Sequence, residues 1–182
     1  MVVQLTKKDP RRLSRGGGFS LIELIAVMIV VGILAAAVAP VLSATASTRA
    51  AMAARHLVRD LTFARQRAVA TGTRSWVVFD TAAETWTVLV EDPASPGRIN
   101  AAVLTDPATS GPFVQTLGVN QFVGVQLVTA AFDGNDEIGF DWLGRPLNQT
   151  EAALAAQGSV TLSGSHVVTV EVGSGFVAYT PP

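Results

Sequence analysis

A glycine run and one glutamate near the start of the chain have types and spacing that could support chemistry. Gly16, Gly17 and Gly18 carry no side chains, so a protease could bind this stretch in an extended conformation. A cut after Gly18 would create a new amine on Phe19, four residues before Glu23. In a medium of low dielectric constant, this amine and the carboxylate would attract each other by several kcal/mol, although lost hydration offsets much of it.

The rest of the chain offers little that could support catalysis. It has two histidines, no cysteine, and neither a nucleophile-elbow nor a phosphate-loop motif. Oxygen-bearing side chains in residues 133–137 suggest a calcium loop, but Ile138 and Gly144 stand where an EF-hand has Gly and Glu, so a polar hairpin turn is favoured. We expect no catalytic residue, no metal site, no cofactor and no small-molecule substrate; the chain is expected not to be an enzyme.

An apolar segment must position Glu23. Residues 19–42 read FSLIELIAVMIVVGILAAAVAPVL, and as a helix they would span about 36 Å, enough for a hydrocarbon core of about 30 Å. Five bases precede this segment and the next one is Arg49, so the positive-inside rule places the N-terminus in the cytoplasm. We therefore expect a basic leader at residues 1–18, a transmembrane helix at residues 19–42, and a body that is periplasmic in a Gram-negative cell.

Two alternatives remain open for this segment. An acid near the membrane interface costs less than the ~3 kcal/mol expected at mid-membrane, so Glu23 could simply extend its carboxylate to water. The basic start, the apolar stretch and the A-x-A patterns in residues 35–39 also describe a conventional secretory signal, which would release a soluble protein. Against that signal, the apolar run exceeds the usual ~7–15 residues, and Pro40 would directly follow the cut.

The remaining pattern predicts one helix followed by a sheet. Residues 43–72 keep helical spacing and stop at Gly72, which predicts an amphipathic stalk helix. Its polar face, either solvated or a docking surface, carries Arg49, Arg55, Arg59, Arg65 and Arg67. An antiparallel sheet on this helix is predicted from β-like runs at 76–79, 86–90, 122–127, 138–140, 160–162, 167–170 and 176–179. Residues 73–182 are the expected periplasmic head, with a long loop at 92–118.

The N-terminal residues closely resemble the class III signal of type IV pilins and type II secretion pseudopilins. The resemblance lies in the basic leader, Gly18, the run Phe19–Glu23 and the apolar segment that follows. It implies that a prepilin peptidase cleaves between Gly18 and Phe19 and methylates the new amine of Phe19. It also implies that Glu23 is required for efficient assembly.

The body resembles the GspH/FimT-type minor pseudopilins. The matching residues are Ala64-Arg65 with Ala68, the strand Val77–Phe79, the Phe-x-x-x-Gly-Arg motif at Phe140–Arg145, and a closing strand pair at Val167–Tyr179. The family's Gly-Arg-Val-like ending is replaced by Gly175-Phe176-Val177. The resemblance implies an α+β, pilin-like fold, in which a long N-terminal helix packs on a C-terminal antiparallel sheet. It also implies a single-pass inner-membrane protein whose C-terminal domain is periplasmic.

Two related functions follow from the resemblance. The first is a minor pseudopilin of a type II secretion system, a structural subunit of the periplasmic pseudopilus that supports protein export across the outer membrane. The alternative is a FimT- or FimU-like minor pilin of a type IV pilus, acting in pilus assembly or DNA uptake. Expected partners are the prepilin peptidase, other pilins or pseudopilins, and the inner membrane. After Ser75 only Arg98 and Arg145 stand against eleven acids, so no nucleic acid is expected.

Overall fold

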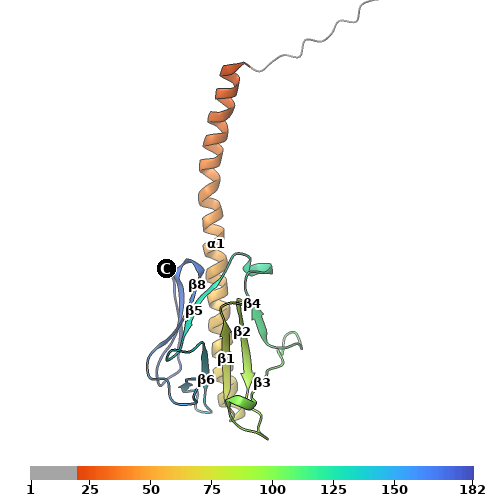
Figure 1. Ribbon diagram of the computed structural model, residues 1–182, viewed down its shortest axis with the longest axis vertical. Helices are drawn as coiled ribbons and strands as arrows, with labels where there is room; N and C mark the ends of the chain where they lie inside the picture. Colours follow the sequence, from red (N-terminus) through yellow and green to blue (C-terminus); the bar gives the residue numbers. More distant parts are fainter. Residues whose placement is uncertain (1–19) are drawn as a thin grey trace, which may run out of the picture. The chain divides into compact units, whose positions relative to one another are not determined.

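The chain was analysed as a computed structural model that describes residues 20–182, without the side chains of residues 36–44. It divides into two compact units, Met1–Val41 and Leu42–Pro182. Helix α1 (Leu21–Thr71) contributes residues to both units (Figure 1). The leader predicted at residues 1–18, together with Phe19, lies outside the described residues.

In the first unit, α1 presents apolar side chains on all sides. Its described side chains from residue 21 to residue 35 are all exposed, and Glu23 is the acid of the first turn. Within the described part of the chain, no helix combines the length and the apolar character needed to cross a membrane. Phe19 and the side chains of residues 36–42 lie outside that part, so the transmembrane helix at residues 19–42 stays a prediction.

In the second unit, the buried apolar face of α1 consists of five alanines and two leucines. Apart from the adjacent pair Ala53 and Ala54, the buried apolar positions follow one another at three- or four-residue steps: Ala50, Ala53, Ala54, Leu57, Leu61, Ala64 and Ala68. This spacing places them on one side of the helix, where alanines let the strands approach closely. The helix ends at Thr71 because Gly72 adopts a φ of 69° and donates its N–H to the carbonyl of Ala68, the usual termination by a left-handed glycine.

The first sheet is antiparallel and has the order β3-β2-β1-β6-β7, with β4 also paired to β2. Its strands are β1 (Ser75–Asp80), β2 (Thr85–Val90), β3 (Ala102–Val103), β4 (Val114–Thr116), β6 (Glu137–Phe140) and β7 (Pro146–Leu147). The central strand β1 pairs Val77 with Val88 on one side and with Ile138 on the other, and all three side chains are buried. The hairpin of β1 and β2 and the later strand β6 thus form the middle of this sheet.

The second sheet has the order β10-β9-β8-β5 and is also antiparallel. Its strands are β5 (Leu127–Ala131), β8 (Gly158–Leu162), β9 (His166–Val170) and β10 (Val177–Thr180). Buried and partly exposed residues alternate along β8 and β9, as expected for strands with one face on the core. Glu84, in the turn between β1 and β2, accepts a hydrogen bond from the backbone N–H of Leu127 and so links the two sheets.

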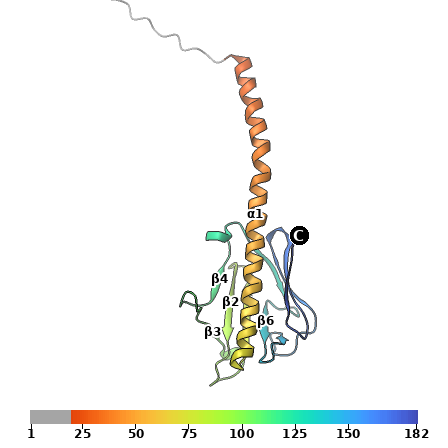
Figure 2. The same ribbon diagram turned by 180° about the vertical axis from the view of Figure 1, so that it is seen from behind.

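The core lies where α1 and the two sheets meet, and the reverse view shows this part of α1 running along the strands (Figure 2). Its largest fully buried side chains include Trp86, Phe79 and Phe132, the last two with their rings stacked 5.7 Å apart. The expected α+β, pilin-like fold is confirmed. The strands, expected in one sheet, are divided between two.

The strand expected at residues 122–127 was wrong. Residues Asn120–Phe122 form the 3-10 helix η2, and β5 begins only at Leu127. Gly124 has a φ of 81°, a left-handed conformation that interrupts an extended strand. The expected long loop at 92–118 contains β3, β4 and the 3-10 helix η1 (Arg98–Asn100).

Candidate functional site

The start of α1 holds the charged residue that the sequence singles out. The hydroxyl and carbonyl oxygens of Ser20 both accept hydrogen bonds from the backbone N–H of Glu23, at 3.3 and 3.1 Å. Ser20 is therefore the N-cap, and Ser-x-x-Glu is the capping-box pattern, in which an acid in the first turn also suits the helix dipole. Sequence reasoning missed this role of Ser20, although the spacing to Glu23 signals it. Gly18 and Phe19 lie outside the described residues.

At the other end of α1, Arg65 joins three segments that are far apart in the sequence. Its Nε–H donates to the carbonyl oxygen of Gly144 at 3.0 Å. Gly144 (φ 78°) and Gly175 (φ 62°) are both left-handed, and a Cβ added at Gly175 would lie 2.5 Å from the same carbonyl oxygen. Residues of the Ala-Arg step, the Phe-x-x-x-Gly-Arg motif and the C-terminal glycine turn therefore form one junction.

The loop between β6 and β7 is shaped by Asp141. One carboxylate oxygen accepts the backbone N–H groups of Leu143 (2.9 Å) and Arg145 (2.8 Å), and the other accepts Nε–H of Arg145 at 2.7 Å. Burial alone would raise the pKa of Asp141, but these hydrogen bonds and the Arg145 charge outweigh it and hold the pKa below its usual value. Asp141 is thus a buried anion whose two oxygens both accept hydrogen bonds, and it orients Arg145.

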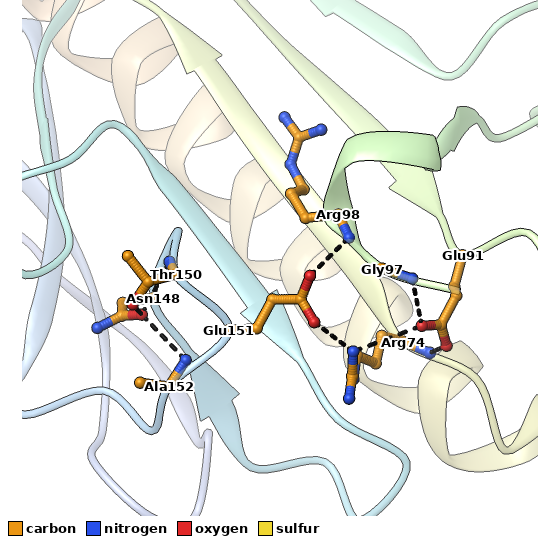
Figure 3. Close-up of polar contacts among 8 residues, drawn as sticks. All are labelled: Arg74, Glu91, Gly97, Arg98, Asn148, Thr150, Glu151 and Ala152. Carbon is orange, nitrogen blue, oxygen red and sulfur yellow. Dashed lines mark hydrogen bonds and ion pairs between the residues drawn. The ribbon is translucent and has the colours of Figure 1, made fainter. Parts of the chain in front are cut away.

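A polar network fastens the loop after β2 to the rest of the head (Figure 3). Glu151 accepts the backbone N–H of Arg98 at 2.7 Å and the Nη1–H of Arg74. Glu91 accepts the backbone N–H groups of Arg74 (2.9 Å) and Gly97 (3.0 Å). Glu151 itself has a φ of 63°, an uncommon conformation for a residue with a side chain.

Arg98 completes this network with the most buried ion pair of the head. Its Nε and Nη2 groups donate to the two carboxylate oxygens of Glu137 at 2.5 and 2.8 Å. Glu137 is 2% exposed, so removal of Arg98 would leave an unpaired buried charge. Arg98, one of the two arginines after Ser75, therefore has a structural role.

The arginines of the stalk helix do not form an array of free cations. Arg49 donates to the carbonyl of Val123 (3.4 Å) and Arg65 to that of Gly144. Arg59 contacts Asp60 and the His56 ring. Within the described residues, Arg55 is exposed and has no polar partner. Nε of Arg67 is buried and also lacks a partner in the part of the chain that the structure describes. The question left open by the sequence, a solvated face or a docking surface, thus concerns Arg55 and Arg67 more than the others.

A buried carboxylate lies behind this helix face. Asp60 is 2% exposed and accepts Nε1–H of Trp86 at 3.0 Å and the guanidinium of Arg59 at 3.3 Å. Burial raises the pKa of Asp60, and the bonds to Trp86 and Arg59 offset this only in part. His56, whose pKa is lowered by burial and by Arg59, packs edge-on against Phe122.

The acidic turn that suggested calcium has a structural role. Asp133 (φ 51°) and Gly134 (φ 85°) form a two-residue turn closed by hydrogen bonds between Phe132 and Asn135. The Asp133 carboxylate accepts the backbone N–H groups of Ala155 (2.9 Å) and Ala156 (3.2 Å), the first of which chiefly lowers its pKa. Among the residues that the structure describes, no group of three or more His, Cys, Asp or Glu could hold a metal ion.

Comparison with known proteins places these features in context. Residues 13–39 match the family model of the prokaryotic N-terminal methylation motif. A comparison with curated protein sequences gave no match. Two solved structures of the minor pseudopilin EpsH from the type 2 secretion system of Vibrio cholerae are similar in fold. One has a TM-score of 0.54 at 12% identity and covers 74% of this chain and 96% of that chain.

The second EpsH structure has a TM-score of 0.55 at 11% identity, covering 75% of this chain and 98% of that chain. At such identities the likeness concerns the fold. The chain thus combines a prepilin methylation motif near its start with a pilin-like fold similar to that of EpsH.

Proposed function

We propose that this prepilin-like chain is a minor pseudopilin of a type II secretion system and a structural subunit of the periplasmic pseudopilus. The observation that carries the proposal is the combination, in one chain, of the methylation motif at residues 13–39 and a head with the EpsH fold. EpsH is itself described as a minor pseudopilin of such a system. The proposed activity is assembly with other pseudopilins to support protein export, without catalysis.

The processing and membrane steps belong to the same proposal. The prepilin peptidase cuts between Gly18 and Phe19 and methylates the amine of Phe19. The transmembrane helix at residues 19–42 then anchors the chain in the inner membrane, with residues 43–72 as the stalk and residues 73–182 as the periplasmic head. Glu23, exposed on the first turn of α1, is the residue that pairs with the new amine during assembly.

A minor pilin of a type IV pilus remains the second candidate, because the same methylation motif is compatible with that function. DNA uptake by the head is disfavoured by the contacts of its three arginines. Arg74 is paired with Glu91 and Glu151, Arg98 with Glu137 and Arg145 with Asp141, so an acid of the head already balances the charge of each. The head thus offers little of the unpaired positive charge that supplies most nonspecific DNA affinity.

A deletion strain separates the two systems. In a cell that makes the chain, its removal should leave proteins exported by the type II pathway trapped in the periplasm, and the gene supplied on a plasmid should restore export. Surface motility by pilus retraction serves as the control and should be unchanged. Normal export combined with lost motility or lost DNA uptake would overturn the proposal in favour of the pilus.

A further inference from the structure

A hollow on the head is lined by two arginines and an exposed tryptophan. It has a volume of about 210 Å³ and is formed by Arg74, Asp141, Trp142, Arg145, Leu147 and Glu151. The guanidinium carbon of Arg74 lies 5.7 Å from the centre of the Trp142 ring, and Trp142 is 49% exposed. A flat aromatic wall and two guanidinium groups therefore face the same open space.

Both arginines keep unused hydrogen-bond donors. The polar contacts of Arg74 use Nη1 of its side chain, and those of Arg145 use Nε. Within the described part of the chain, Nε and Nη2 of Arg74 and both Nη groups of Arg145 have no acceptor. A guanidinium has five N–H donors in a planar fork that matches a carboxylate.

The two acids of the hollow act as supports for these arginines. Asp141 is already bonded by two backbone N–H groups and Nε of Arg145, and Glu151 by the Arg98 N–H and Nη1 of Arg74. Each acid therefore fixes a guanidinium by one edge and leaves the other edge open. A side chain held in place in this way binds with a smaller loss of conformational entropy.

We propose that this hollow binds an acidic side chain of a partner protein, whose carboxylate takes the free N–H groups of Arg74 and Arg145 while its stem packs on Trp142. Charge favours a peptide carboxylate over a nucleic acid. The hollow itself is formally neutral, because Asp141 and Glu151 balance its two arginines, and it offers N–H donors rather than net charge. The head around it is acidic, with three arginines and eleven acids in residues 73–182, so a long polyanion would be repelled there. The proposal does not depend on which filament the chain joins.

The test uses the full-length chain in nonionic detergent and calorimetric titration with a blocked tetraglutamate peptide. We expect saturable binding with a dissociation constant on the order of 1 mM or tighter and none with tetraglutamine. Arg145→Gln should weaken binding roughly tenfold or more. This variant should fold, because Arg145 is 57% exposed and Asp141 keeps its backbone hydrogen bonds. Trp142→Ala should also weaken binding.

Arg55→Gln is the matched control, since it removes an exposed and unpaired arginine outside the hollow. It should leave binding unchanged, and circular dichroism should show that every variant is folded. The proposal is overturned if tetraglutamate does not saturate at concentrations about tenfold above the expected constant. Equal losses in Arg55→Gln and Arg145→Gln would overturn it as well. A short single-stranded DNA that binds more tightly than tetraglutamate, and whose binding is abolished by Arg145→Gln, would also overturn the proposal. The hollow would then be a phosphate site.

Discussion

The guanidinium of Arg65 and the carbonyl oxygen of Gly144 are 3.0 Å apart, although 79 residues separate them in the chain. This contact ties the last turns of α1 to the loop between β6 and β7. A Cβ at Gly175 would lie 2.5 Å from that carbonyl and 3.2 Å from Nε of Arg65. The junction therefore requires a glycine at position 175 for space as well as for its left-handed backbone.

Gly175→Ala is expected to lower the free energy of unfolding of the head by at least about 2 kcal/mol, since positive-φ strain and the clash with Gly144 add together. Gly173→Ala is the matched control, because Gly173 has a φ of 75° but has nothing within 4 Å of its added Cβ. It should cost only about 1 kcal/mol. Thermal unfolding followed by tryptophan fluorescence measures both, and equal losses would contradict the proposed crowding.

Asp60→Asn is expected to stabilise the head at neutral pH, because it removes a charge that burial disfavours. Burial raises the pKa of Asp60 in the folded chain, so the folded state holds this proton more tightly than the unfolded state. The stabilisation from the protonated acid is complete below the unfolded pKa, near 3.8, and is lost as the pH rises through the raised folded pKa. The amide carries no charge and can still accept Nε1–H of Trp86.

Urea unfolding at several pH values tests this prediction. The advantage of Asp60→Asn over the unmodified chain should shrink as the pH falls toward 4. Asp60→Ala is the control that leaves Trp86 Nε1–H without its acceptor, and it should destabilise the head by about 1–3 kcal/mol. An advantage of Asp60→Asn that is independent of pH would contradict the titration of a buried acid.

The mature chain is expected to begin at N-methylated Phe19. Mass spectrometry of the protein extracted from membranes should find a first peptide that starts at Phe19 and carries one additional methyl group. The variant Gly18→Ala, at the cut site, is the processing control, because it should leave the leader attached. A mature protein that starts at Pro40 would instead support cleavage of a conventional secretory signal.

Glu23→Gln is expected to leave cleavage intact and to impair incorporation into filaments, because it removes the charge that would pair with the Phe19 amine. Glutamine also fits the fourth position of a capping box, so the helix start held by Ser20 should be preserved. Ser20→Ala is the matched control, since it removes the cap but keeps the charge. Recovery in sheared or cross-linked filaments measures incorporation, and normal recovery of Glu23→Gln would assign Glu23 to the membrane interface alone.

The elements that sequence predicted well are those whose pattern is local. The strands at 76–79 and 86–90 are marked by β-branched and aromatic residues, and both exist as β1 and β2. Strands β3 and β7 have two residues each, too few for an alternating pattern to show. The division into two sheets follows from long-range pairing, such as β1 with β6 and β5 with β8, which no local signal encodes.

The polar sites were also predictable to different degrees, because some are marked by a local pattern and others depend on long-range contacts. Glu23 stands out because a charge in an apolar run has a cost that the sequence alone reveals. Arg74 and Glu151, by contrast, are 77 residues apart, and each looks like an ordinary surface charge until the fold joins them. The hollow beside Trp142 likewise exists only because two loops meet.

The hairpin between β3 and β4 offers a place to label this protein. Its base is closed by a hydrogen bond from the N–H of Asp106 to the carbonyl oxygen of Gly111, and the residues at its tip, 107–110, are exposed. Lengthening a surface loop costs little, about 0.6 kcal/mol for each doubling of its length. A short epitope inserted after Ala108 would thus leave both sheets intact. In cells whose outer membrane has been permeabilised, antibody access to the epitope would report when this side of the head becomes covered by neighbouring subunits.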